Sequence, residues 1–124
     1  MDLQALSTHI RCQSLEQLPH SVCAGGPLFK LGKVVFEPGT WEAIPSSILL
    51  RALELHSCGV FGKLELYEIQ NNFENVRRLE KISRGQQTYV GCIFSRWCPR
   101  DYLRFIVVSN WTNSMNTAVV AMEK

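Results

Sequence analysis

Two pairs of histidine and cysteine near the N-terminus have the residue types of a zinc site. His9 and Cys12 form one His-x-x-Cys pair, and His20 and Cys23 form another, seven residues further along the chain. Two imidazole nitrogens and two thiolates suit tetrahedral zinc, and a two-residue gap lets one turn present both ligands of a pair. The usual pattern is Cys-x-x-Cys with a longer intervening loop. We therefore expect no cofactor, with zinc at these four residues as the alternative.

Two segments in the C-terminal part of the chain, residues 96–102 and 109–116, combine arginine, aromatic residues and asparagine. Trp, Tyr and Arg supply much of the binding energy at protein interfaces. We therefore predict that these segments bind a protein partner, and the competing interpretation is an ordinary solvated hairpin loop. The predicted partner-binding residues are Arg96, Trp97, Arg100, Tyr102, Trp111 and Asn113.

A nucleic-acid surface is the alternative use of the same arginines. Arginine pairs with phosphate, and Trp or Tyr rings stack on bases. A basic cluster at the end of a predicted helix would extend such a surface. The residues of this alternative are Arg77, Arg78, Lys81, Arg84, Arg96 and Arg100.

His56 is the remaining candidate for catalysis. It is predicted to lie in the last turn of a helix that ends at Gly59, where an imidazole can satisfy terminal carbonyl groups. A general base needs a nucleophile or an orienting carboxylate nearby, and the sequence identifies neither beyond the neighbouring Ser57 and Cys58. A small enzyme that uses His56 with a cysteine is therefore the least favoured hypothesis, and a non-enzymatic role is expected.

The composition fits one folded domain without a strong charge preference. The chain has 124 residues, 46% hydrophobic and 19% charged, which is enough for one buried core. A net charge of +2 is too small to select a nucleic acid or a membrane by its field. No run approaches the about 18 apolar residues of a membrane span, and the N-terminus lacks a secretory pattern. We therefore expect a cytoplasmic protein with free thiols and no membrane partner.

An N-terminal extension over residues 1–27 and an α+β domain over residues 28–124 are predicted. The Ala-Gly-Gly-Pro sequence at residues 24–27 marks the break between them. An early strand is expected at residues 34–36, because two valines and a phenylalanine precede Glu-Pro-Gly turn residues.

Two main helices follow the early strand. The first begins at Ser46 or Ser47, which can cap it, and ends at Gly59. The second covers residues 65–84, where apolar residues recur at intervals of three and four and Gly85 is the predicted terminator.

Three short apolar segments, residues 88–94, 103–108 and 117–122, predict strands joined by short polar connections. An antiparallel meander is the simplest topology for them. The predicted architecture is therefore a single domain with two helices packed on one face of a three-stranded meander, plus the early strand.

The stretch from residue 28 to residue 124 resembles a family of small uncharacterised proteins carried by bacterial plasmids and other mobile elements. The matching pieces include Leu-Gly-Lys-Val-Val at residues 31–35, the helix ending in His56, and the strand at residues 103–108. The chain departs from that family at residues 60 and 61, where Val and Phe replace Asp and Trp, and at residues 109–114. The resemblance implies a shared fold and a setting in mobile DNA.

The leading hypothesis is a mobile-element accessory protein that binds a protein partner, for instance to inhibit a host defence complex. The nucleic-acid module is the alternative, and the small enzyme is the third hypothesis. The sequence does not fix the oligomeric state.

Overall fold

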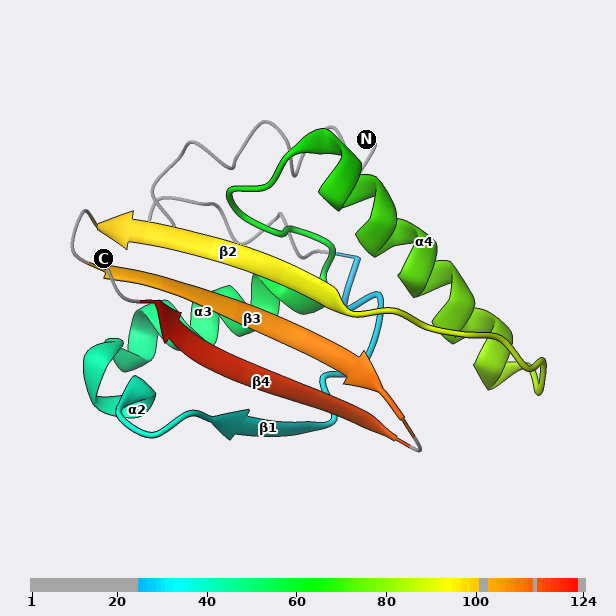
Figure 1. Ribbon diagram of the computed structural model, residues 1–124, viewed down its shortest axis with the longest axis horizontal. Coiled ribbons are helices and arrows are strands. Elements are labelled where there is room, and N and C mark those ends of the chain that lie inside the picture. The colour runs from blue at the N-terminus through cyan, green and yellow to red at the C-terminus, as the bar shows by residue number, and fades with distance from the viewer. Residues whose placement is uncertain (1–24, 101–102, 113, 123–124) are drawn as a thin grey trace.

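The computed structural model describes residues 25–100, 103–112 and 114–122 (Figure 1). The four zinc candidates, His9, Cys12, His20 and Cys23, lie outside this range, as do Tyr102 and Asn113. The elements in chain order are β1 (Lys33–Phe36), α2 (Thr40–Ala43), α3 (Ser46–Ser57), α4 (Leu66–Ser83), β2 (Ile93–Arg100), β3 (Leu103–Trp111) and β4 (Met115–Met122).

The strands form one four-stranded sheet in the order β1-β4-β3-β2. β2, β3 and β4 pair antiparallel as the predicted meander, and β1 pairs parallel with β4. The predicted α+β class is confirmed. The early strand is a full member of the sheet, which corrects the predicted count of three strands in it.

β2 lies later in the chain than the sequence predicts. Residues 88–92 precede the strand, and the predicted loop at residues 96–100 is part of it. Pairing with the long strand β3 extends β2 from Ile93, opposite Ser109, to Arg100, opposite Leu103. The register shifts between Trp97 and Arg100. Such an irregularity on an edge strand accommodates a proline that cannot donate a ladder hydrogen bond.

The helix α4 confirms the second predicted helix to within one residue at each end. Glu65 and Glu68 form a capping box at its start, so backbone amides that lack helical partners are satisfied. Gly85 has a φ of 81° after its last turn, which is the left-handed conformation that commonly ends a helix. Its buried apolar residues include Ile69, Phe73 and Val76.

The core divides into two clusters of buried side chains. One lies between α3 and the sheet and includes Leu49, Leu55 and Phe105. The other joins α4 to the start of β2 through Phe73 and Ile93. α3 therefore lies behind the sheet and α4 beside its β2 edge (Figure 1).

Gly62 lets the segment before α4 approach the edge of β2. Its φ is 71°, and a Cβ atom here would lie 2.2 Å from the carbonyl oxygen of Arg96. The close approach permits two backbone hydrogen bonds, from Arg96 to Phe61 and from Lys63 to Arg96. This segment therefore covers part of the free edge of β2.

Candidate functional site

One face of the sheet carries no helix in the described part of the chain, and we call it the outer sheet face. α3 packs on the opposite face, and no described helix crosses the face turned toward the viewer in Figure 1. Burial alternates along β3, so that Leu103, Phe105 and Val107 point inward and their neighbours point outward. The strand register places the outward residues of the four strands in common rows.

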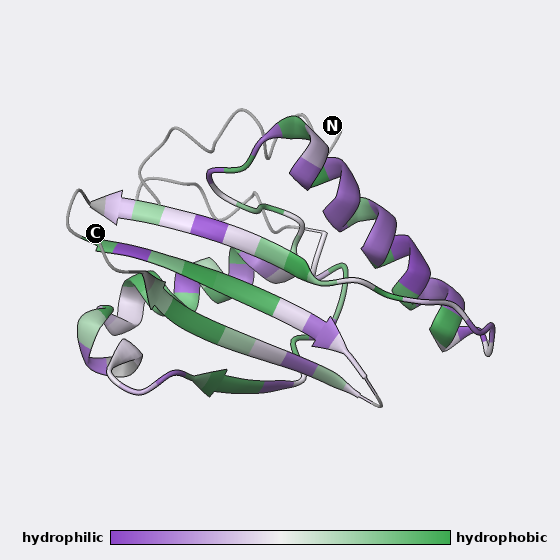
Figure 2. Cartoon of the chain, in the orientation of Figure 1, coloured by the Kyte–Doolittle hydropathy of each residue, from purple (hydrophilic) through white to green (hydrophobic). Residues whose placement is uncertain are grey.

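The centre of the outer sheet face is an apolar band of five side chains. Val35 pairs with Ala118, which pairs with Val108, so these three residues lie in one row. Ile106 and Val120 pair in the adjacent row. Val35 is 43% exposed, and the other four are partly exposed. Figure 2 shows the hydrophobic colouring that runs along the middle of β3 and along β4. A contiguous exposed apolar patch on a folded domain commonly marks an interaction site.

Positive charge frames the apolar band. The outward positions of the described strands include Lys33, Arg96 and Arg104, and none of those positions holds a carboxylate. The guanidinium of Arg96 lies 5.9 Å from the ring centre of Phe94 and 3.7 Å from a carboxylate oxygen of Glu68. Arg96 is therefore partly neutralised, whereas the structure pairs neither of the other two cations with a described carboxylate.

Trp97 is not on the surface. It is 5% exposed, and it belongs to the core cluster between α3 and the sheet. Its Nε1 donates a hydrogen bond of 2.7 Å to the hydroxyl oxygen of Ser95. The side chain therefore stabilises the fold, which corrects its predicted place in an exposed loop.

The other predicted partner-binding residues are dispersed. Arg96 lies on the outer sheet face, whereas Trp111 is at the end of β3, on the inward side of its strand. Arg100 is the last residue of β2. The structure thus does not gather Arg96, Trp97 and Trp111 into one surface.

The predicted basic cluster at the end of α4 is partly neutralised. Arg77 contacts a carboxylate oxygen of Glu74 at 2.8 Å, and Arg78 lies 3.8 Å from the other oxygen of the same group. These arginines lower the pKa of Glu74, chiefly through the hydrogen bond from Arg77. Among the described residues, Lys81 and Arg84 have no such carboxylate partner.

His56 lies in a buried hydrogen-bond chain that joins α3 to three strands. Its Nδ1 is 2.8 Å from the hydroxyl of Ser95, and its Nε2 is 2.9 Å from that of Ser109. The Ser109 hydroxyl is 2.8 Å from that of Thr117, which donates to the carbonyl oxygen of Leu31 at 2.7 Å. The prediction that His56 satisfies the carbonyls at its helix end is therefore wrong.

The carbonyl group at one end of this hydrogen-bond network fixes the direction of the bonds from Leu31 to His56. At one end, a carbonyl can only accept, so Thr117 donates to it and accepts from Ser109, which in turn accepts from Nε2 of His56. This end of the network places a proton on Nε2. At the other end, the indole of Trp97 donates to Ser95. Because burial keeps the imidazole neutral, its Nδ1 carries no proton and accepts a hydrogen bond from Ser95.

Burial keeps the imidazole of His56 neutral. Its side chain is 0% exposed, and desolvation of the charged form lowers its pKa from 6.5 to about 3. The rings of Phe29 and Phe61 contact it edge-on. A general base must reach the proton that it removes. Since both nitrogens are engaged and no part of the ring reaches the surface, this geometry gives the enzyme hypothesis no support.

Asn72 and Asn75 on α4 are structural residues that the sequence analysis missed. Both are buried. The side-chain amide of Asn72 bonds to the backbone of Phe94 in β2, and that of Asn75 bonds to the backbone of residues 91 and 92, just before β2. Each amide acts as a substitute for a neighbouring strand along this edge. The sequence signal is their spacing of three residues, beside the apolar positions 69, 73 and 76.

The described residues contain no group of three or more His, Cys, Asp or Glu side chains placed to hold a metal ion. Cys58 and Cys92 are free thiols. No described helix combines the length and the hydropathy of a membrane span.

Comparisons with protein-family models, with curated proteins and with solved structures found no match to this chain. The resemblance to plasmid-borne proteins therefore stays a prediction.

Proposed function

We propose that this protein is a non-enzymatic binding module that docks a protein partner on the outer sheet face. The observation that carries the proposal is the apolar band of Val35, Ile106, Val108, Ala118 and Val120, which no described helix covers and which cations frame. Burial of such a band against a partner is favourable by roughly 25 cal/mol per Å² of apolar surface.

The charges around the band favour one kind of occupant, an amphipathic segment with carboxylates beside its apolar face. Lys33 and Arg104 stand at outward positions on different strands, so they flank the band. A carboxylate opposite each of them would steer the partner and fix its orientation. A second copy of the chain would instead bring the same cations together, which repels.

Nucleic acid is the less favoured occupant of this face. Base stacking needs exposed aromatic rings, and the five residues of the band are aliphatic. Phe94, the aromatic residue next to the band, packs against the α4 cluster and lies under the guanidinium of Arg96. The resemblance to plasmid-borne proteins supplies a setting for the proposal, in which the partner belongs to a host defence complex.

The test is affinity purification from the native host, with mass spectrometry and nucleic-acid recovery on the same eluates. The test variant combines Val35→Glu with Arg104→Glu, two exposed positions of the outer sheet face. The matched control combines Leu50→Glu with Lys30→Glu, which likewise replaces one aliphatic residue and one cation at exposed positions elsewhere. Circular dichroism checks that both variants are folded.

The proposal expects a protein that the wild type and the control retain and the test variant loses. That protein should contact the chain through an acidic amphipathic segment. A partner that the test variant retains, recovery of nucleic acid alone, or recovery of this chain alone would each contradict the proposal.

A further inference from the structure

A pocket lies between the end of α4, the loop that follows it and the end of β3, and it is distinct from the outer sheet face. Its volume is about 700 Å³, which falls within the size range of small-molecule sites. Tyr89 and Trp111 contribute aromatic rings to it from different segments. The lining residues are Ile82, Gly85, Gln86, Gln87, Thr88, Tyr89 and Trp111.

Hydrogen bonds hold the two ends of the loop that forms one side of this pocket. The amide of Gln86 bonds to the carbonyl of Lys81, and that of Gly85 bonds to Ile82, each at 2.9 Å, which closes the last turn of α4. Gly91 donates to the side chain of Asn75 at 2.9 Å and so holds the far end of the loop. These hydrogen bonds hold the backbone on both sides of residues 87–90, which form one side of the open pocket.

The lining suits a flat ring with polar edges. Tyr89 is 79% exposed although it is aromatic, so its ring is available for stacking. Trp111 offers a second ring, and the amides of Gln86 and Gln87 can donate to and accept from a heterocycle. Aromatic side chains stack on nucleobases of any sequence. The pocket lining contains no charged residue, so the charge that a ligand must carry depends on the residues around the pocket.

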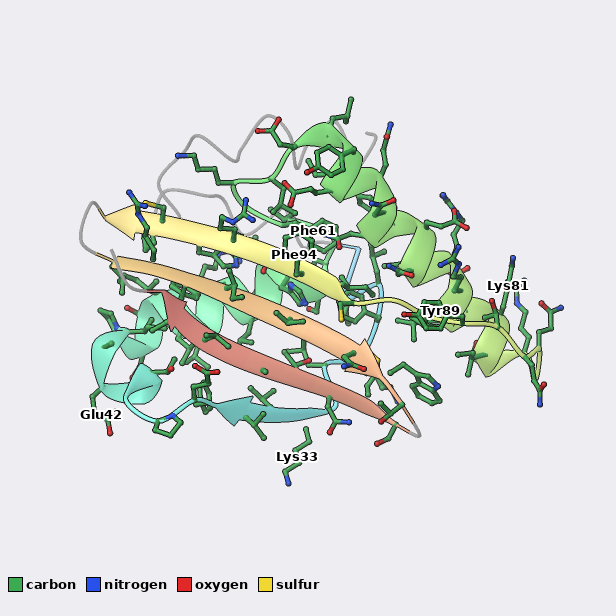
Figure 3. The ribbon with its side chains drawn as sticks, viewed as in Figure 1. Lys33, Glu42, Phe61, Lys81, Tyr89 and Phe94 are labelled. Carbon is green, nitrogen blue, oxygen red and sulfur yellow. The ribbon has the colours of Figure 1, made fainter. Side chains whose placement is uncertain are left out.

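Lys81 and Arg84 supply that charge. They flank Ile82 at the C-terminal end of α4, and among the described residues neither is paired with a carboxylate. Figure 3 shows Lys81 and Tyr89 in the same region of the molecule, at this end of α4. Arg77 and Arg78 are already paired with Glu74. Lys81 and Arg84 are adjacent in the chain to the lining residues Ile82 and Gly85, so they can offer a counter-charge to a phosphate group at the rim of the pocket.

We propose that this pocket binds one nucleotide, with the base against Tyr89 and Trp111 and the phosphate beside Lys81 and Arg84. The nucleotide can be free or can be the end of a single strand, and both sources share this chemistry. The inference does not rest on the proposed function, because it uses different residues on a different part of the surface.

Isothermal titration of the full chain with AMP, UMP, adenosine and a 5′-phosphorylated adenine tetranucleotide tests the proposal. Tyr89→Leu is the test variant, and Tyr67→Leu is its matched control, because Tyr67 is an exposed tyrosine on α4 outside the pocket. The double variant Lys81→Gln with Arg84→Gln tests the phosphate contact.

Tyr89→Leu should weaken binding of AMP by about tenfold or more, and Tyr67→Leu should leave it unchanged. The double variant should bind AMP no more tightly than adenosine. If AMP and the tetranucleotide bind with equal affinity, the ligand of the pocket is a free nucleotide. If the tetranucleotide binds more tightly, the ligand is the end of a single strand. The proposal fails if AMP, UMP and the tetranucleotide show no saturable binding at millimolar concentration. It also fails if Tyr89→Leu or the double variant binds AMP like the wild type.

Discussion

The side-chain amide of Asn72 forms two hydrogen bonds with the backbone of Phe94. Its Nδ2 donates to the carbonyl oxygen at 2.6 Å, and its Oδ1 accepts from the amide at 3.1 Å. A neighbouring strand would make the same pair of bonds. The helix α4 therefore satisfies the edge of β2 through a side chain, which holds the first strand of the meander in place.

We predict that Asn72→Ala destabilises the protein, whereas Asn71→Ala does not. The first substitution leaves both polar groups of the Phe94 backbone without a partner in a partly buried site. The cost should be about 2–4 kcal/mol in the free energy of unfolding, because an unsatisfied buried group costs about 1–3 kcal/mol. Asn71 is exposed, so its substitution should change stability by less than about 0.5 kcal/mol. Urea denaturation of both variants measures the difference, and equal effects would contradict this role.

The buried His56 should make the protein sensitive to mild acid. The unfolded chain takes up a proton below pH 6.5, whereas the folded chain resists it until about pH 3. The contribution to stability is therefore complete above pH 6.5. It should be lost at about 1.4 kcal/mol per pH unit as the pH falls from 6.5 toward 3.

The comparison variant for this effect is His56→Gln, which removes the titrating group and retains a polar side chain. Urea unfolding at pH 7 and at pH 5 should show a steeper loss of stability for the wild type than for the variant. Parallel losses would show that other groups cause the acid sensitivity.

Trp97→Ala should unfold or strongly destabilise the protein. Truncation of a buried Trp costs about 3–5 kcal/mol, and here it also removes the hydrogen bond to Ser95. The matched substitution Tyr67→Ala removes an exposed aromatic side chain and should change stability by less than about 0.5 kcal/mol. Thermal unfolding monitored by circular dichroism compares the two. A stable Trp97→Ala variant would show that the indole is not a core residue.

Local patterns in the sequence predict the two main helices, the antiparallel meander and the α+β class. α4 is predicted closely, because its apolar stripe and Gly85 are signals carried within one segment. β2 is misplaced, because its extent is decided by its pairing with β3 across the hairpin. Residues 88–92 have the composition of a strand, but they pair with no strand in the described part of the chain, and Pro99 lies where the register of β2 shifts.

The buried polar residues are the part that the sequence does not reveal. His56 meets Ser95 and Ser109, which lie 39 and 53 residues away in the chain. Each serine alone is an ordinary inward residue of an apolar strand, and only the sheet register brings both to the imidazole. The outer sheet face also depends on the sheet register, because each of its rows joins residues from different strands. Local patterns in the sequence therefore predict binding residues in loops and do not predict this face.

Site-specific photo-crosslinking in the native host tests the outer sheet face most directly. A photoreactive phenylalanine analogue is placed at Val35, at Val108, or at the control position Leu50, which is 65% exposed on α3. We predict that Val35 and Val108 crosslink to the same acidic amphipathic segment of one protein and that Leu50 does not. Equal crosslinking from all three positions, or crosslinking from Leu50 alone, would contradict the assignment of the outer sheet face as the docking surface.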